Sequence, residues 1–207
     1  MKPTHVPAIL AAACAAAQPM AAHAHHAMGN ALPGNVFEGL VSGLAHPVIG
    51  LDHFVFVLAL GAACYYFGQR LVGIGAFLAA ALTGTILHVQ QVTLPHAEVW
   101  VAASLLLLGC MLLFAMPALK SVAGTLLLAT AGIVHGYAYG ESIVGAEPTP
   151  LAAYLAGFTV IQLCIGLGGF ALTRHADRMR RSTAAVRTAG GVASIAGVAF
   201  LMMARAG

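Results

Sequence analysis

Residues 48–67 read VIGLDHFVFVLALGAACYYF. The run contains one acid, Asp52, and one imidazole, His53, and its other side chains are apolar or weakly polar. A membrane-spanning helix needs about 20 such residues, because each residue adds about 1.5 Å to a helix. The apolar residues do not alternate with polar ones, and only helices and closed barrels satisfy every backbone group in lipid. The run therefore predicts a transmembrane α-helix.

Five further apolar runs follow along the chain. Hydrophobic residues make up 60% of the 207 residues and charged residues 7%, whereas a soluble domain carries about 25% charged residues. The prolines fall at or between the ends of the runs, where a missing N–H does least damage. We therefore expect an all-α, polytopic membrane helix bundle in which residues 25–207 form one domain. Its six expected spans are residues 48–67, 71–94, 99–116, 122–139, 151–173 and 188–204.

Residues 1–24 have the pattern of a signal peptide. Met1 and Lys2 form a short charged start, and the apolar stretch that follows is too short to span a bilayer. Ala22-His23-Ala24 has the small-x-small form of a signal-peptidase site. We expect cleavage after Ala22 or Ala24, and an uncleaved anchor is the alternative.

The basic residues are distributed unevenly along the chain. Of nine Lys and Arg residues, one lies at Arg70, one at Lys120 and five between residues 174 and 187, which makes seven of nine in three connections. These connections lie on the same side of a six-span bundle. Because cytoplasmic loops are enriched in Lys and Arg, we expect them inside the cell and both mature termini outside.

The charged residues also exclude several classes of protein. The basic residues are few and scattered, which is unlike a nucleic-acid-binding face. Lys2 and Lys120 are the only lysines, so the chain has no P-loop ATPase motif and no lysine within a span to bind retinal. An ATP-driven activity would therefore need a partner.

Ionisable side chains at membrane depth are expensive and usually mark a site or a pathway. In the predicted topology such groups open the first span, end the second and close the fourth, so all of them fall in the outer half of the membrane. Imidazole and carboxylate together are ligands for a divalent transition metal. The predicted metal ligands are His46, Asp52, His53, His88, His135 and Glu141. A short His-rich tract is a weaker hint of metal binding, and it adds His23, His25 and His26.

The spacing of His46 and His53 adds a geometric condition. Along a straight helix they would lie about 10.5 Å apart, whereas two ligands of one ion each lie about 2 Å from it. We therefore expect Pro47 and Gly50 to break the helix and to give the first span an irregular start, buried in protein. Asp52 and His53 would then be direct ligands, with His46 a ligand or a supporting partner.

Simpler readings remain open for two residues. His88 alone could be only an interhelical hydrogen-bond partner. Asp52 could be a structural partner of His53.

These motifs resemble those of the HupE/UreJ family of bacterial nickel and cobalt transporters. The first span resembles the family signature through His46-Pro47-x-x-Gly50-x-Asp52-His53, followed by Gly61. The fourth span resembles a second motif through His135-Gly136-Tyr137-Ala138-Tyr139-Gly140-Glu141. Tyr139 stands where the resemblance leads us to expect a second histidine. The resemblance implies metal uptake with His46, Asp52, His53, His135 and Glu141 as functional residues.

The expected function is that of a permease, not an enzyme, in the bacterial cytoplasmic membrane. The transported ion would be Ni²⁺ or Co²⁺, with no prosthetic group. We expect the protein to lie in the lipid bilayer. Metallochaperones or metalloenzyme maturation proteins are candidate recipients of the transported ion. Two alternatives remain: a metal-binding accessory or sensor protein, and an intramembrane metalloenzyme whose ion activates water, although the chain has no H-E-x-x-H motif.

Overall fold

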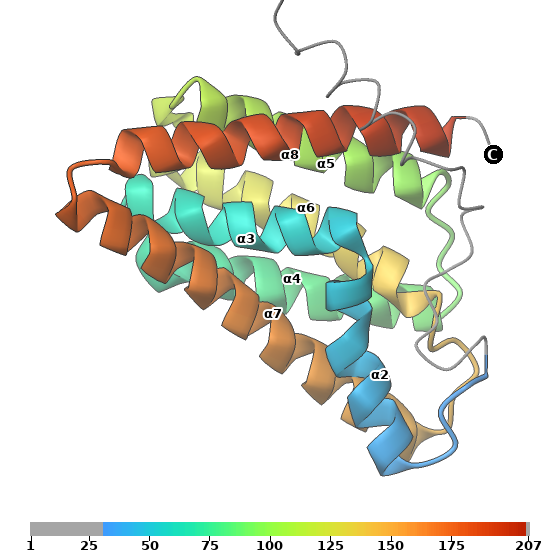
Figure 1. Cartoon of the computed structure of the whole chain (residues 1–207). Coiled ribbons are helices and arrows are strands. Elements are labelled where there is room, and N and C mark those ends of the chain that lie inside the picture. Colours follow the sequence, from blue (N-terminus) through green and yellow to red (C-terminus); the bar gives the residue numbers. More distant parts are fainter. Residues whose placement is uncertain (1–30, 206–207) are drawn as a thin grey trace, which may run out of the picture.

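The computed structural model describes residues 31–205, and within this range the chain is helical with no strand. Figure 1 shows a helical bundle in which α2 turns away from the start of α3 and runs beside the first part of α7. The predicted all-helical fold is confirmed, while the expected signal peptide and the histidines at 23, 25 and 26 lie outside the described residues. The α-helices are α2 (Val36–Ile49), α3 (Leu51–Tyr66), α4 (Arg70–Val89), α5 (Ala97–Leu113), α6 (Val122–Gly140), α7 (Pro148–Arg178) and α8 (Ser182–Ala204), with a 3₁₀ turn, η1 (Pro117–Lys120), before α6.

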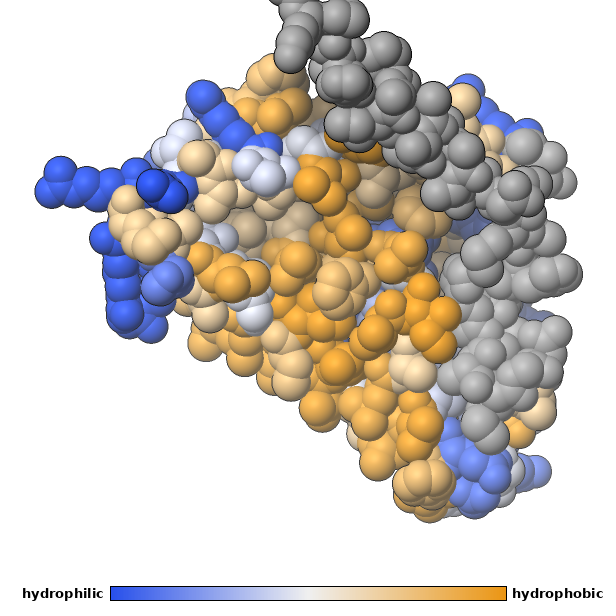
Figure 2. Space-filling model, viewed as in Figure 1, coloured by the Kyte–Doolittle hydropathy of each residue, from blue (hydrophilic) through white to orange (hydrophobic). Residues whose placement is uncertain are grey.

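Each of the six predicted runs coincides with one of the helices α3 to α8. Four helices, α4, α6, α7 and α8, are long and apolar enough to cross a membrane, and the bent pair α2 and α3 counts as a fifth candidate. Helix α5 is apolar but has only 17 residues. Figure 2 shows a largely apolar face with hydrophilic residues gathered toward its ends. The chain is therefore a multi-pass membrane protein, and the count of six spans stays a prediction.

Helix α2 differs from the irregular start that the sequence led us to expect. Asn35 caps it by accepting a hydrogen bond from the Glu38 N–H at 3.0 Å, and the Glu38 carboxylate accepts from the Asn35 amide at 2.8 Å. The bond from the Glu38 N–H satisfies one backbone donor of the first turn, and the bond from the Asn35 side-chain amide holds the capping side chain in place. His46 and Pro47 then lie inside regular helix, so the expectation of irregular backbone there was wrong. The expected break itself is confirmed at Gly50, where α2 and α3 meet with a bend of 79°.

Glycines bring the helices together in close pairs. A side chain at Gly84 on α4 would collide with the backbone of α6 at Ile133, and one at Gly61 on α3 would collide with α7 at Gly166. In the same way, α5 meets α8 where Gly109 faces Ser194. Small residues allow such close backbone approach in lipid, where no hydrophobic force drives helices together. The close pairs are thus α4 with α6, α3 with α7 and α5 with α8.

Substitution of Gly84 should show how much this close packing contributes. We expect Gly84→Ala to lower the free energy of unfolding by about 1–3 kcal/mol, the usual cost of overpacking, because its Cβ would lie 2.8 Å from the backbone nitrogen of Tyr137. Gly75→Ala on the same helix is the control, since no atom lies within 4 Å of the added carbon. Thermal unfolding in detergent measures both variants. Equal midpoints for the two variants would contradict the close α4–α6 contact.

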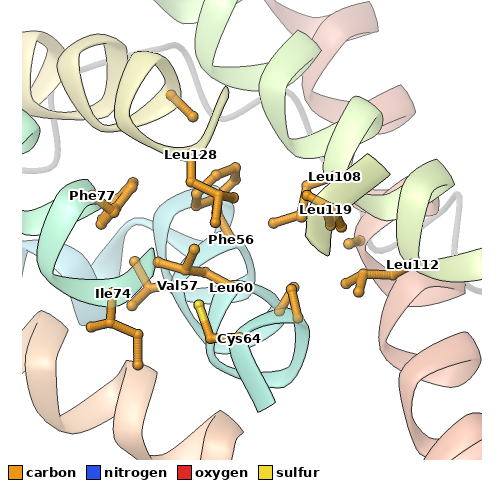
Figure 3. Packing of buried hydrophobic residues seen from close by; sticks show 14 of the residues in the cluster. Phe56, Val57, Leu60, Cys64, Ile74, Phe77, Leu108, Leu112, Leu119 and Leu128 are labelled. Carbon is orange, nitrogen blue, oxygen red and sulfur yellow. The ribbon is translucent and has the colours of Figure 1, made fainter. Parts of the chain in front are cut away.

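Helix α3 lies at the centre of the apolar core. Its buried side chains Phe56, Val57 and Leu60 pack with residues from α4, α5 and α6, as Figure 3 shows. The ring of Phe56 stacks on that of Phe77 from α4, with centroids 5.3 Å apart. This core fixes the position of α3. The polar residues of its first turn, Asp52 and His53, precede Phe56 by about one helical turn.

The connections that carry most basic residues meet at one end of the bundle. Tyr65 at the end of α3 donates a hydrogen bond of 2.9 Å to Asp177 near the end of α7, and Gln69 donates one of 2.6 Å to the Leu119 carbonyl. A hydrogen bond from Ser182, and then that from Tyr65, lowers the pKa of the Asp177 carboxyl. The Arg70, Lys120 and Arg-rich α7–α8 connections thus share one end, as the predicted topology requires.

Candidate metal centre

The bend at Gly50 brings His46 and His53 together. Their ring centroids lie 6.2 Å apart, much closer than the distance of about 10.5 Å for seven residues of straight helix, and both residues are buried. A Cβ on Gly50 would lie 2.8 Å from Cδ2 of His53 and 3.3 Å from Oδ1 of Asp52. The absence of a side chain at position 50 therefore leaves room for these two groups.

Asp52 lies beside His53 at the start of α3. Its Oδ1 accepts a hydrogen bond of 2.8 Å from the His53 backbone N–H and lies 4.0 Å from the ring nitrogen Nε2. Its side chain keeps 20% of its surface exposed, against 8% for His53. The carboxylate thus lies between the buried imidazole and the surface, where it can attract a cation.

His135 on α6 contacts the ring of His53 from the opposite helix. Its Nδ1 lies 2.8 Å from Nδ1 of His53, and the residue is fully buried. The rings of Phe56 and Phe77 lie 4.2 Å and 5.8 Å from the His135 ring and close the site toward the core. Two nitrogens at this distance share one proton in a hydrogen bond.

Three hydroxyl-bearing residues surround His46. Ser142 places its Oγ 3.1 Å from Nδ1 of His46 and 3.0 Å from the hydroxyl of Tyr154, which comes from α7. The Tyr154 hydroxyl donates to the Tyr139 carbonyl at 3.0 Å. Ser142 and Tyr154 were not predicted from the sequence. The Ser142 hydroxyl contacts His46, which lies 96 residues earlier in the chain, and the Tyr154 hydroxyl contacts Ser142.

The third of these residues, Tyr139, contributes its ring directly to the histidine cluster. Its centroid lies 4.3 Å from that of His53 and 5.1 Å from that of His46. Its hydroxyl is buried and has no hydrogen-bond partner among residues 31–205. A buried hydroxyl without a partner costs about 1–3 kcal/mol. This cost is removed if a water molecule or an ion's hydration shell occupies the site.

The structure brings together His46, Asp52, His53 and His135, but places the other two candidates differently. Nδ1 of His88 lies 2.6 Å from the Tyr137 carbonyl, and the His88 ring stacks on that of Tyr137. This is the interhelical contact that the sequence left open for His88. Glu141 is exposed just beyond the last turn of α6.

The cluster is not a closed metal cage in this conformation. Within residues 31–205, no three His, Cys, Asp or Glu side chains converge closely enough to hold an ion. The pair of Nδ1 atoms nevertheless has a suitable separation, since two ligands about 2.1 Å from an ion and at right angles lie about 3.0 Å apart.

The apolar helices and the buried imidazole cluster define an all-α, multi-pass membrane protein with a polar site enclosed by its helices. Comparison with known sequences agrees with this class. Residues 11–200 match the family model described as HupE / UreJ protein. The chain is also 31% identical over 195 residues to Protein HupE of Rhizobium leguminosarum bv. viciae, which covers 91% of this chain and 94% of that protein. The chain belongs to the HupE/UreJ family. No solved structure matches it.

Proposed function

We propose that this protein is a permease for uptake of a divalent transition-metal ion, Ni²⁺ or Co²⁺, through the histidine cluster. Membership of the HupE/UreJ family, whose proteins are generally nickel and cobalt uptake proteins, supports the proposal. The observation that carries it is the 2.8 Å separation of the His53 and His135 Nδ1 atoms in a buried site beside Asp52. Neutral imidazole nitrogens with a carboxylate suit such an ion.

In the proposed binding step, the hydrated ion exchanges water for the two Nδ1 atoms and Asp52. The His53 ring must then carry its proton on Nε2, which faces the Asp52 carboxylate. His46 approaches as a further ligand, and the Tyr139 hydroxyl oxygen accepts a hydrogen bond from a water molecule that the ion keeps. Exposed Glu141 attracts the ion from solution, and His88 joins only if it leaves the Tyr137 carbonyl.

The proposed direction of transport follows from the basic end of the bundle. The positive-inside rule places the connections at Arg70, Lys120 and residues 174–187 in the cytoplasm. Ion uptake then moves two positive charges inward. The membrane potential contributes about 4.6 kcal/mol per 100 mV to this movement, twice the value for one charge. No ATPase is needed for such a gradient-driven step.

Uptake of radioactive nickel and cobalt tests the proposed function. A host without its own nickel and cobalt transporters expresses the full chain, and cells with the empty vector serve as the control. We expect both ions to accumulate above the control, and the ratio of the two initial rates identifies the preferred substrate. If the chain is abundant in the membrane and neither ion accumulates, it is not a permease for them, and an accessory or sensor role becomes the better explanation.

A further inference from the structure

Ser104 on α5 contacts the far side of the His135 ring. Its Oγ lies 2.9 Å from Nε2 of His135 and 2.8 Å from the Val101 carbonyl oxygen. Two oxygens this close need a proton between them, and a carbonyl has none to give. The Ser104 hydroxyl therefore donates to Val101, and its oxygen accepts a hydrogen bond from Nε2–H of His135.

This hydrogen bond determines the tautomer of His135. A neutral imidazole carries one N–H, so a proton on Nε2 leaves Nδ1 with a lone pair. That lone pair faces His53, whose Nδ1–H is then the donor in the 2.8 Å contact. His135 thus presents an unprotonated nitrogen toward the proposed ion position before any ion arrives.

Among residues 31–205, no other hydroxyl forms a hydrogen bond with His135. Ser104 lines an apolar cavity of about 200 Å³ between α5 and α6, with Leu107, Leu127 and Val134 among its walls. Thr130 also lines this cavity, but its hydroxyl bonds to the Leu126 carbonyl at 2.9 Å and forms no hydrogen bond with His135. Loss of the Ser104 hydroxyl would therefore leave Nε2–H of His135 facing apolar groups.

We propose that Ser104 is a positioning residue that fixes His135 in the tautomer with a lone pair on Nδ1. The relevance of this role to ion binding rests on the proposed permease function. Without Ser104, the proton of His135 is no longer favoured on Nε2, and the Nδ1–H tautomer places a proton where the ion binds. Loss of a partner that orients a metal-binding histidine typically costs about 10–100-fold in metal affinity.

Three variants separate the hydroxyl from its surroundings. Ser104→Ala removes the hydroxyl, and Ser104→Thr keeps it while adding a methyl group for which the cavity has room. Thr130→Val is the matched control, because it removes a hydroxyl from the same cavity without touching His135.

The first measurement is the tautomer itself, in the full chain without metal. The ¹⁵N NMR shifts of ¹⁵N-histidine-labelled protein in lipid bilayers distinguish protonated from unprotonated ring nitrogens, and comparison with His135→Asn assigns the signals. We expect His135 protonated on Nε2 in the unmodified chain, in Ser104→Thr and in Thr130→Val, and a mixture or the reverse in Ser104→Ala. Protonation on Nδ1 in the unmodified chain, or no change in Ser104→Ala, would overturn the proposal.

The second measurement is binding of NiCl₂ and CoCl₂ to the purified chain by calorimetry. We expect a Kd at least about 10-fold weaker for Ser104→Ala and within about 3-fold of the unmodified value for the other two variants. Weakening in Ser104→Thr equal to that in Ser104→Ala would contradict a role for the hydroxyl. If the unmodified chain binds neither ion, the proposed function fails, while the tautomer measurement still decides the role of Ser104.

Discussion

Cells that express the Asp52→Ala, His53→Ala double variant should accumulate no more nickel or cobalt than cells without the chain. The variant removes a nitrogen of the 2.8 Å imidazole pair and the carboxylate next to it. Of the proposed ligands, only His135 and the more distant His46 are then left to replace the water that the ion loses. Removal of merely supporting residues costs about 10–100-fold in metal affinity, so loss of two direct ligands should cost more than about 100-fold in uptake.

The chain offers a matched control for this experiment. His175→Ala, Asp177→Ala removes the same two residue types from exposed positions at the basic end of the bundle. We expect this control to retain most of its uptake. Initial uptake rates of radioactive nickel, normalised to the amount of chain in the membrane, provide the comparison. If the Asp52→Ala, His53→Ala variant takes up nickel at the wild-type rate at equal abundance in the membrane, these residues do not form the transport site.

The helices could largely be predicted from the sequence, because lipid imposes a simple condition on the backbone. Every run of about 20 apolar residues must form a helix to satisfy its N–H and C=O groups. Helix α2 was missed because its stability comes from its contact with α7. Its residues include Glu38, Ser42 and two glycines, Gly39 and Gly43, whose positions allow the α7 backbone to approach. That contact joins segments more than 100 residues apart in the chain, so no local pattern indicates it.

The sequence identified the site residues whose burial in a membrane costs much free energy, and it missed those whose burial costs little. His46, Asp52, His53 and His135 are noticeable because ionisable groups rarely enter a membrane without a role. Ser104 and Ser142 give no such signal, since hydroxyls are common in membrane helices and bond readily to nearby carbonyls. Their roles depend on which helix faces which, and this is visible only in the fold.

Predicted depth in the membrane did not by itself identify the role of His88. Its predicted depth equals that of the other histidines, but its ring packs on Tyr137 and its Nδ1 contacts the Tyr137 carbonyl. Depth along the membrane normal does not indicate the direction in which a side chain points. Tyr139, in contrast, was singled out as a departure from the expected motif, and the structure places its ring against His46 and His53.

Tyr139→Phe should reduce ion uptake without reducing stability. The hydroxyl has no partner among the described residues, so its removal breaks no hydrogen bond within residues 31–205 and relieves the cost of a buried, unsatisfied group. In the proposed bound state, the oxygen of this hydroxyl would accept a hydrogen bond from a water molecule in the ion's shell. A hydrogen bond to a charged group is worth about 1.5–3 kcal/mol, so we expect uptake to fall by about tenfold or more.

Tyr154→Phe provides the comparison, because Tyr154 is equally buried but its hydroxyl is hydrogen-bonded to Ser142 and to the Tyr139 carbonyl. This variant should lose about 1 kcal/mol of stability, whereas Tyr139→Phe should unfold at the same temperature as the unmodified chain or higher. Thermal unfolding in detergent and nickel uptake rates measure the two effects separately. If Tyr139→Phe instead unfolds at lower temperature and transports normally, the hydroxyl stabilises the fold and has no part in ion binding.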